Sequence, residues 1–204
     1  MLRFLLRWSL YLGLAGAAVA GAAIFYYSRD LPPLEGIHEI KRRPLVVVQD
    51  AEGRTLATYG DLYGDPVRLY DLPPHVTRAV MAIEDRRFFR HWGVDPLGLA
   101  RAVAVNIMSG RIRQGGSTLT QQLAKVAFLT PERSMGRKVR EALLALKIED
   151  QFTKDEILAF YLNRVYFGSG AYGLEAASRR YFGRPAKNLT LYQAAMLAGL
   201  LRSP

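Results

Sequence analysis

The hydrophobic positions change their pattern twice along the chain. The first segment, WSLYLGLAGAAVAGAAIFYY, runs from Trp8 to Tyr27 without a charged residue. Residues 44–60 then give two short β-rich runs on either side of an Asp-Ala-Glu-Gly turn at 50–53, and residues 74–204 carry apolar side chains at helical spacing. This pattern predicts a long apolar helix, a β hairpin and a mainly α-helical domain, in that order.

The uncharged segment has the length of a transmembrane helix, which needs about 20 apolar residues. Aromatic residues stand at both of its ends, and Arg3 and Arg7 precede it. The positive-inside rule then predicts a single-pass protein of the cytoplasmic (inner) membrane with its domain on the extracytoplasmic side. A signal peptide cleaved after Ala20 is the alternative, but the apolar run continues past that site. We expect an N-terminus and anchor over 1–30, a linker over 31–43 and the domain over 44–204.

Local signals mark where the helices of this domain begin. Asp95 before Pro96 predicts a helix start, and three Thr residues are followed three positions later by Gln or Glu, as in a capping box. These three pairs are Thr118/Gln121, Thr153/Glu156 and Thr190/Gln193. They predict short, well-delimited helices.

The composition indicates that the protein binds an anionic partner. The 204 residues carry a net charge of +10, with 50% hydrophobic and 23% charged residues and no cysteine. Eleven Lys or Arg residues lie between Arg86 and Arg140, against only Asp95 and Glu132. Nucleic acid is disfavoured because no nucleic-acid-binding motif is present, so an anionic lipid head group or a diphosphate fits better. Solvated surface remains the alternative for most of these arginines.

The segment AIEDRRFFRHWG, residues 82–93, places Glu84 at the end of an apolar helical run and surrounds it with positive charge. A partly buried carboxylate is suited to act as a general base. Asp85 does not share its helical face and is expected to have a positioning role. His91 is expected to be a hydrogen-bonded structural residue.

Three later segments carry polar residues at suggestive spacing. In GGSTLTQQLAK (115–125) the residues Ser117, Gln121 and Lys125 are expected to share one helical face, although a plain capping box is the alternative. In RKVREALLALKIED (137–150) the expected buried face is Val139, Ala142, Leu143 and Leu146, and Glu141 could form ordinary ion pairs with Arg137 and Lys138. KDEILAFYLNRVYFGSGAYGLEAAS (154–178) ends a helix near Asn163 and continues into a glycine-rich connection.

Together and in this order, these four segments resemble the successive motifs of glycosyltransferase family 51, the peptidoglycan glycosyltransferase domain of class A penicillin-binding proteins and monofunctional transglycosylases. AAMLAGLLRSP at the end of the chain resembles the start of the fifth motif. The resemblance implies a lysozyme-like α fold that polymerises lipid II into β-1,4 glycan with inversion and release of undecaprenyl diphosphate.

The resemblance also implies residue roles. Glu84 would be the general base, and Glu141 would assist at the diphosphate, either directly and without a cofactor or through a divalent cation such as Mg or Mn. The residues implied in substrate binding are Asp85, Ser117, Thr118, Gln121, Gln122, Lys125, Arg133, Arg137, Lys138 and Asn163. The implied partners are lipid II, the nascent glycan chain, the membrane and other cell-wall synthesis proteins.

Two other functions stay open at this point. A lytic transglycosylase or lysozyme-like hydrolase would share the fold and a single catalytic Glu, but it would not need a basic diphosphate site. A membrane-tethered fragment could bind lipid II without turning it over, since family members continue beyond the position of Pro204. No penicillin-reactive transpeptidase motif set is present, so no transpeptidase is expected within these residues.

Overall fold

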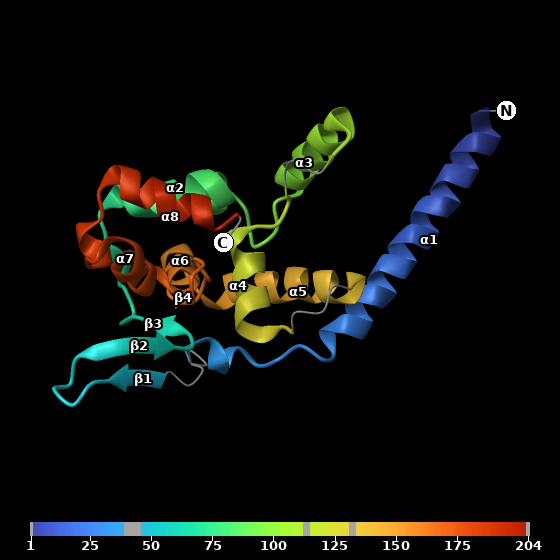
Figure 1. Ribbon diagram of the computed structural model, residues 1–204. Helices are drawn as coiled ribbons and strands as arrows, with labels where there is room; N and C mark the ends of the chain where they lie inside the picture. The colour runs from blue at the N-terminus through green and yellow to red at the C-terminus, as the bar shows by residue number, and fades with distance from the viewer. Residues whose placement is uncertain (1, 39–45, 112–114, 131–133, 203–204) are drawn as a thin grey trace.

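The computed structural model describes residues 2–38, 46–111, 115–130 and 134–202. The domain is mainly helical, as the sequence predicts, with two small sheets (Figure 1). The α-helices are α1 (Leu2–Ser28), α2 (Pro74–Glu84), α3 (Pro96–Ser109), α4 (Leu119–Phe128), α5 (Met135–Gln151), α6 (Lys154–Leu162), α7 (Leu174–Phe182) and α8 (Leu191–Leu200). The strands are β1 (Val46–Gln49), β2 (Thr55–Tyr59), β3 (Leu62–Tyr63) and β4 (Ala171–Tyr172). Short 3-10 helices are η1 (Leu34–His38), η2 (Leu69–Asp71), η3 (Phe88–Arg90) and η4 (Ala186–Asn188).

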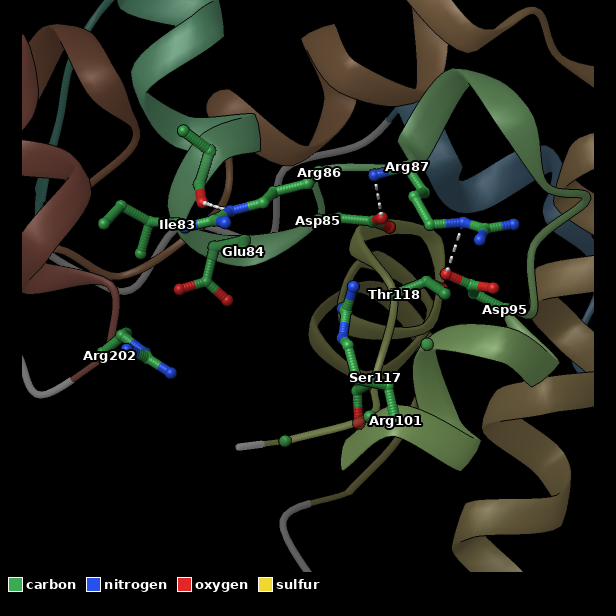
Figure 2. Close-up of a pocket in the computed structure, with 14 residues that line it drawn as sticks. Ile83, Glu84, Asp85, Arg86, Arg87, Asp95, Arg101, Ser117, Thr118 and Arg202 are labelled. Atoms are coloured by element: carbon green, nitrogen blue, oxygen red, sulfur yellow. Dashed lines mark hydrogen bonds and ion pairs between the residues drawn. The ribbon is translucent and has the colours of Figure 1, made fainter. Parts of the chain in front are cut away.

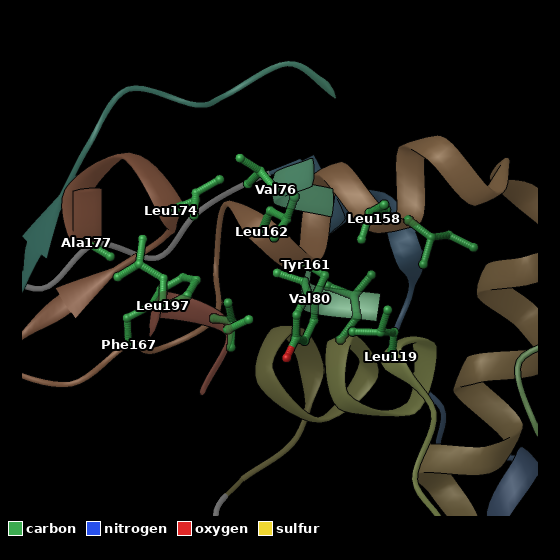
Figure 3. Close-up of a cluster of buried hydrophobic side chains, with 14 of the residues drawn as sticks. Val76, Val80, Leu119, Leu158, Tyr161, Leu162, Phe167, Leu174, Ala177 and Leu197 are labelled. Carbon is green, nitrogen blue, oxygen red and sulfur yellow. The ribbon is translucent and has the colours of Figure 1, made fainter. Parts of the chain in front are cut away.

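The core lies where α2, α4, α6, α7 and α8 meet (Figure 3). Val80, Leu119, Tyr161, Leu162 and Leu197 come from four of these helices, and each is at most 1% exposed. Burial of an apolar side chain of this size contributes about 1.5–3 kcal/mol each. In Figure 1 α2 and α8 lie side by side, and α4 packs on α5 and α6. This packing holds the ends of α2 and α4 close to each other.

The predicted hairpin is present over its described residues. Strands β1 and β2 pair antiparallel, and the turn between them is closed by Asp50, whose carboxylate accepts hydrogen bonds from the N–H groups of Glu52 at 3.1 Å and Arg54 at 2.7 Å. Gly53 has φ +80°, a conformation that glycine adopts without a steric cost. Residues 44 and 45, also assigned to the hairpin, lie outside the described part.

Part of the predicted linker over 31–43 is folded. Residues 34–38 form η1, in which Leu34 is 4% and Ile37 0% exposed. The Arg164 guanidinium donates a hydrogen bond to the Ile37 carbonyl. The stretch predicted as a linker therefore contributes two apolar side chains to the core, which its composition did not indicate. Residues 39–43 are not described.

A second small sheet was not predicted. Strand β4, in the glycine-rich connection, pairs in parallel with β3, with Leu62 opposite Ala171 and Tyr63 opposite Tyr172. The rings of Tyr63 and Tyr172 stack with centroids 5.2 Å apart. The connection after α6 is thus tied to the segment that precedes α2.

The buried face of α5 also differs from the expectation. Its buried residues are Glu141, Leu144, Ala145 and Ile148, whereas Leu146 is 44% exposed. Both sets have helical spacing, but packing of α4 against α5 selects the stripe that contains Leu144 and Ile148. Glu141 belongs to that stripe and is carried into the interior.

Helix α1 spans the predicted apolar segment as one helix and extends away from the rest of the chain (Figure 1). It meets the domain near its C-terminal end, where the Arg140 guanidinium lies 5.4 Å from the centre of the Tyr27 ring. Within the part of the chain that the structure describes, no helix is long and apolar enough to be identified as a membrane span.

Candidate active site

The C-terminal end of α2, the beginning of α3 and the loop before α4 enclose a pocket of about 280 Å³ (Figure 2). Charged side chains dominate its wall. The acidic ones are Glu84, Asp85 and Asp95, and the basic ones are Arg86, Arg87, Arg101 and Arg202. Ser117, Thr118 and the glycines 98, 115 and 116 complete the polar part of the lining. The pocket therefore gathers residues from two of the four sequence segments around a surplus of positive charge.

Glu84 is the last residue of α2, and only one of its two carboxylate oxygens accepts a hydrogen bond from a described residue. Its Oε2 atom accepts a hydrogen bond from the Gln122 amide nitrogen at 2.7 Å. Its Oε1 atom is buried and has no hydrogen-bond partner among the described residues. A buried acceptor without a partner costs about 1–3 kcal/mol, and an unsatisfied atom of this kind in a native fold calls for a functional explanation.

Asp85 lines the pocket and also connects α2 to His91 and α4. It is 8% exposed, and its Oδ2 atom lies 2.9 Å from His91 Nε2 and accepts the Leu119 N–H at 3.1 Å. Leu119 is the first residue of α4, so the carboxylate lies at the positive end of that helix, where negative charge is stabilised. The structural roles expected for Asp85 and His91 agree with these contacts.

Gly93 joins the first motif to α4 and α5. Its φ is +69°, and a Cβ atom there would lie 2.8 Å from the backbone of Ala145 in α5. Its carbonyl accepts a hydrogen bond from the Thr118 hydroxyl. Only glycine fits here, because the backbone has a positive φ and a side chain would clash with α5. The hydrogen bond to the Gly93 carbonyl also holds Thr118 in place.

The common face expected for Ser117, Gln121 and Lys125 is not formed. Helix α4 begins after Thr118, so Ser117 lies outside it. Gln121 is 5% exposed because its side chain accepts the Thr118 N–H at 3.1 Å in a capping box. Lys125 is exposed and does not line the pocket. The capping alternative thus explains Thr118 and Gln121.

Glu141 joins the third motif to the second. The Lys138 ammonium donates hydrogen bonds at 2.7 Å to both Glu141 Oε2 and Ser117 Oγ, and Arg137 Nη1 lies 3.4 Å from Glu141 Oε1. The two cations neutralise a carboxylate that is only 3% exposed. They also repel a divalent ion, and the described residues contain no group of three His, Cys, Asp or Glu side chains placed to hold one. These side chains do not fit the Mg or Mn ion considered from the sequence.

The remaining implied residues lie elsewhere. The Asn163 side chain accepts the Val67 N–H at 2.7 Å and donates to the carbonyls of Val67 and Ala159 at 2.9 Å, so its polar atoms are used within the fold. Arg133 is outside the described residues.

Sequence reasoning gave no site role to Arg101, Arg202 or Tyr161. Arg101 in α3 and Arg202 after α8 both reach the pocket, and Figure 2 shows them with Glu84 around the same open space. Tyr161 donates a hydrogen bond to the Gln122 side-chain oxygen at 3.1 Å. The basic composition was a signal for the arginines, but nothing in it distinguished these two from the others.

The comparisons with known proteins agree on one family. The model of the family described as Transglycosylase matches residues 52–204. The chain is 44% identical over 182 residues to penicillin-binding protein 1A of Pseudomonas aeruginosa, covering 89% of this chain and 22% of that protein. It is 42% identical to penicillin-binding protein 1A of Escherichia coli over 191 residues, or 94% of this chain and 22% of that protein. The corresponding Aquifex aeolicus protein is 45% identical over 195 residues, or 95% of this chain and 27% of that protein. The chain therefore spans about a quarter of the length of these relatives.

Proposed function

The chain belongs to the transglycosylase family, and from this premise we propose that it is a peptidoglycan glycosyltransferase that polymerises lipid II. In this reaction the 4-hydroxyl oxygen of the acceptor forms a bond to the anomeric carbon of the donor. The bond from that carbon to the lipid diphosphate breaks with inversion, the hydroxyl proton passes to Glu84, and undecaprenyl diphosphate leaves.

The observation that carries the proposal is the placement of Glu84. Its Oε1 atom has no hydrogen-bond partner among the described residues, and its carboxylate forms part of a pocket wall. A general base has to lie within hydrogen-bond reach of the proton that it abstracts. We assign this role to Oε1, because Oε2 is already bound to Gln122.

The arginines of the pocket support the second half of the reaction. Negative charge grows on the leaving diphosphate in the transition state, and cations already in place stabilise it without reorganisation. Arg101 and Arg202 have no acidic partner among the described residues, whereas Arg87 lies 3.3 Å from Asp95. We assign the diphosphate to the pocket residues Arg101, Arg202 and Ser117, with Arg137 and Lys138 supporting Ser117 and Glu141 behind them.

The same charge distribution argues against a hydrolase. A lytic enzyme that cleaves finished glycan has no diphosphate to hold, so it gains nothing from unpaired guanidinium groups beside its carboxylate. A protein that only binds lipid II has no need of a carboxylate with a free, buried oxygen. Both alternatives remain outcomes of the experiment below.

The sequence of α1 supports membrane attachment of the domain. The helix carries about 20 successive uncharged residues and exposes large apolar side chains along its length, including Trp8, Leu14 and Ile24. We propose that α1 anchors the domain on the extracytoplasmic side of the inner membrane, where lipid II is presented. A reporter fused after the domain tests this: activity in the cytoplasm would overturn the orientation.

Incubation of the intact protein with labelled lipid II separates the three functions. A glycosyltransferase lengthens the label into polymer and leaves finished glycan intact. Cleavage of finished glycan would indicate the hydrolase, and retention of lipid II without turnover would indicate the binding protein.

A further inference from the structure

A chain of hydrogen bonds runs from the core of the domain to the carboxylate of Glu84. The Tyr161 hydroxyl donates to Gln122 Oε1 at 3.1 Å, and Gln122 Nε2 donates to Glu84 Oε2 at 2.7 Å. The three residues come from α6, α4 and α2, which are packed together. Tyr161 is 1% exposed, so the chain starts from a side chain that the core holds rigidly.

The Tyr161 hydroxyl selects the orientation of the Gln122 amide. An amide has an oxygen that accepts and a nitrogen that donates, and only the nitrogen is a suitable partner for a carboxylate. Burial, and after it the charge of Glu84, raise the pKa of Tyr161 above its ordinary value, so its hydroxyl keeps its proton. That proton is donated to the amide oxygen, which turns the amide nitrogen toward Glu84.

We propose that Gln122 and Tyr161 are positioning residues for Glu84, which rests on the proposed role of Glu84 as general base. The Gln122 amide fixes Oε2 and thereby the plane of the carboxylate. The other oxygen, Oε1, is left without a partner among the described residues and takes the proton. The resemblance to the family placed Gln122 among substrate-binding residues; its contacts instead make it act through Glu84.

The proposal predicts a change in how the reaction depends on pH. The Gln122 N–H stabilises the charged form of Glu84, together with the guanidinium groups of Arg86, Arg101 and Arg202 and against the neighbouring Asp85. Loss of that N–H removes a hydrogen bond to the charged form. The acid limb of the kcat profile therefore moves to higher pH when the amide is removed or turned.

The test measures lipid II polymerisation across pH for three variants of the intact protein. Gln122→Met keeps the length of the side chain but removes both hydrogen bonds, and it is expected to lower kcat about 10- to 100-fold with little change in KM. Tyr161→Phe removes one hydroxyl and is expected to cause a smaller loss with a shift of the acid limb in the same direction. Tyr181→Phe is the control, because it removes a hydroxyl that donates to the Phe167 carbonyl at 3.0 Å, outside the pocket.

The outcomes separate this inference from the proposed function. A wild-type profile in both Gln122→Met and Tyr161→Phe overturns the inference, as does a loss confined to KM, which would return Gln122 to substrate binding. A pH-independent loss that follows the melting temperature, and that Tyr181→Phe shares, would make the role merely structural and also overturn it. Full activity of Glu84→Gln, in contrast, would remove the general base itself.

Discussion

The carboxylate of Asp85 accepts a hydrogen bond from the backbone N–H of Leu119 at 3.1 Å, across 34 positions of the sequence. This contact joins the end of α2 to the first residue of α4. Glu84 and Gln122, which lie on these two helices, are thereby held at hydrogen-bond distance. The residue beside the proposed base therefore joins the two helices that carry Glu84 and Gln122.

Asp85→Asn is expected to destabilise the fold more than it slows the reaction per folded molecule. The substitution removes the negative charge from the N-terminus of α4 and from the pair with His91, contacts worth about 1–3 kcal/mol together. Thermal unfolding and polymerisation rate should be measured side by side. A rate loss as large as that of Glu84→Gln, with an unchanged melting temperature, would assign Asp85 to the chemistry instead.

Gly93→Ala is expected to be strongly destabilising. The new methyl group meets the Ala145 backbone at 2.8 Å, and the residue also has to adopt φ +69°. Backbone strain of this kind costs about 1–3 kcal/mol before the clash is added. Gly53→Ala is the matched control, since Gly53 has φ +80° with nothing within 4 Å. Equal changes in melting temperature for the two variants would show that the contact with α5 is unimportant.

Arg101→Ala and Arg202→Ala are expected to lower kcat/KM for lipid II about 10- to 100-fold each, because each removes a cation from the side assigned to the diphosphate. Their melting temperatures should change little, since both side chains are exposed. Arg180→Ala removes an exposed arginine of α7 that does not line the pocket and serves as the control. Equal kinetics in all three variants would show that Arg101 and Arg202 are ordinary solvent-exposed residues that do not bind the diphosphate.

The capping box of α6 predicts a pH-dependent contribution to stability. Hydrogen bonds from Thr153, first from its backbone N–H and then from its hydroxyl, lower the pKa of Glu156 below its ordinary value of 4.5. A carboxyl group with a lowered folded-state pKa stabilises the fold above its ordinary pKa, and this stability is lost as pH falls through the lowered value. The difference in melting temperature between the protein and Glu156→Gln should therefore be present at neutral pH and vanish in acid. A difference that grows toward low pH would contradict the assignment.

The features that sequence analysis predicted correctly depend on neighbouring residues. The capping boxes at Thr118 and Thr153 each use a partner three positions away, and the hairpin turn closes through Asp50 and Gly53. Such contacts are encoded within a few residues, so the pattern reveals them. The order of the motifs added what spacing could not, namely the family to which the chain belongs.

The features that it missed depend on contacts between distant segments. Strand β4 has two residues and pairs with β3 more than a hundred positions earlier, which leaves no periodic signal. Packing between distant segments likewise decides that Ile37 is buried and which apolar stripe of α5 faces the core. It also brings Arg202 to the pocket that contains Glu84. The contact between Tyr161 and Gln122 joins two motifs whose spacing along the chain carries no sign of it.

The rate of lipid II polymerisation by Glu84→Gln tests the account most directly. Glutamine keeps the size of the side chain but does not accept the hydroxyl proton, so a general base at this position predicts a loss of about 100-fold or more in kcat. Lipid II binding and the melting temperature should stay close to those of the unsubstituted protein, measured in the same preparation. A folded Glu84→Gln protein that polymerises lipid II at the unsubstituted rate would contradict the account.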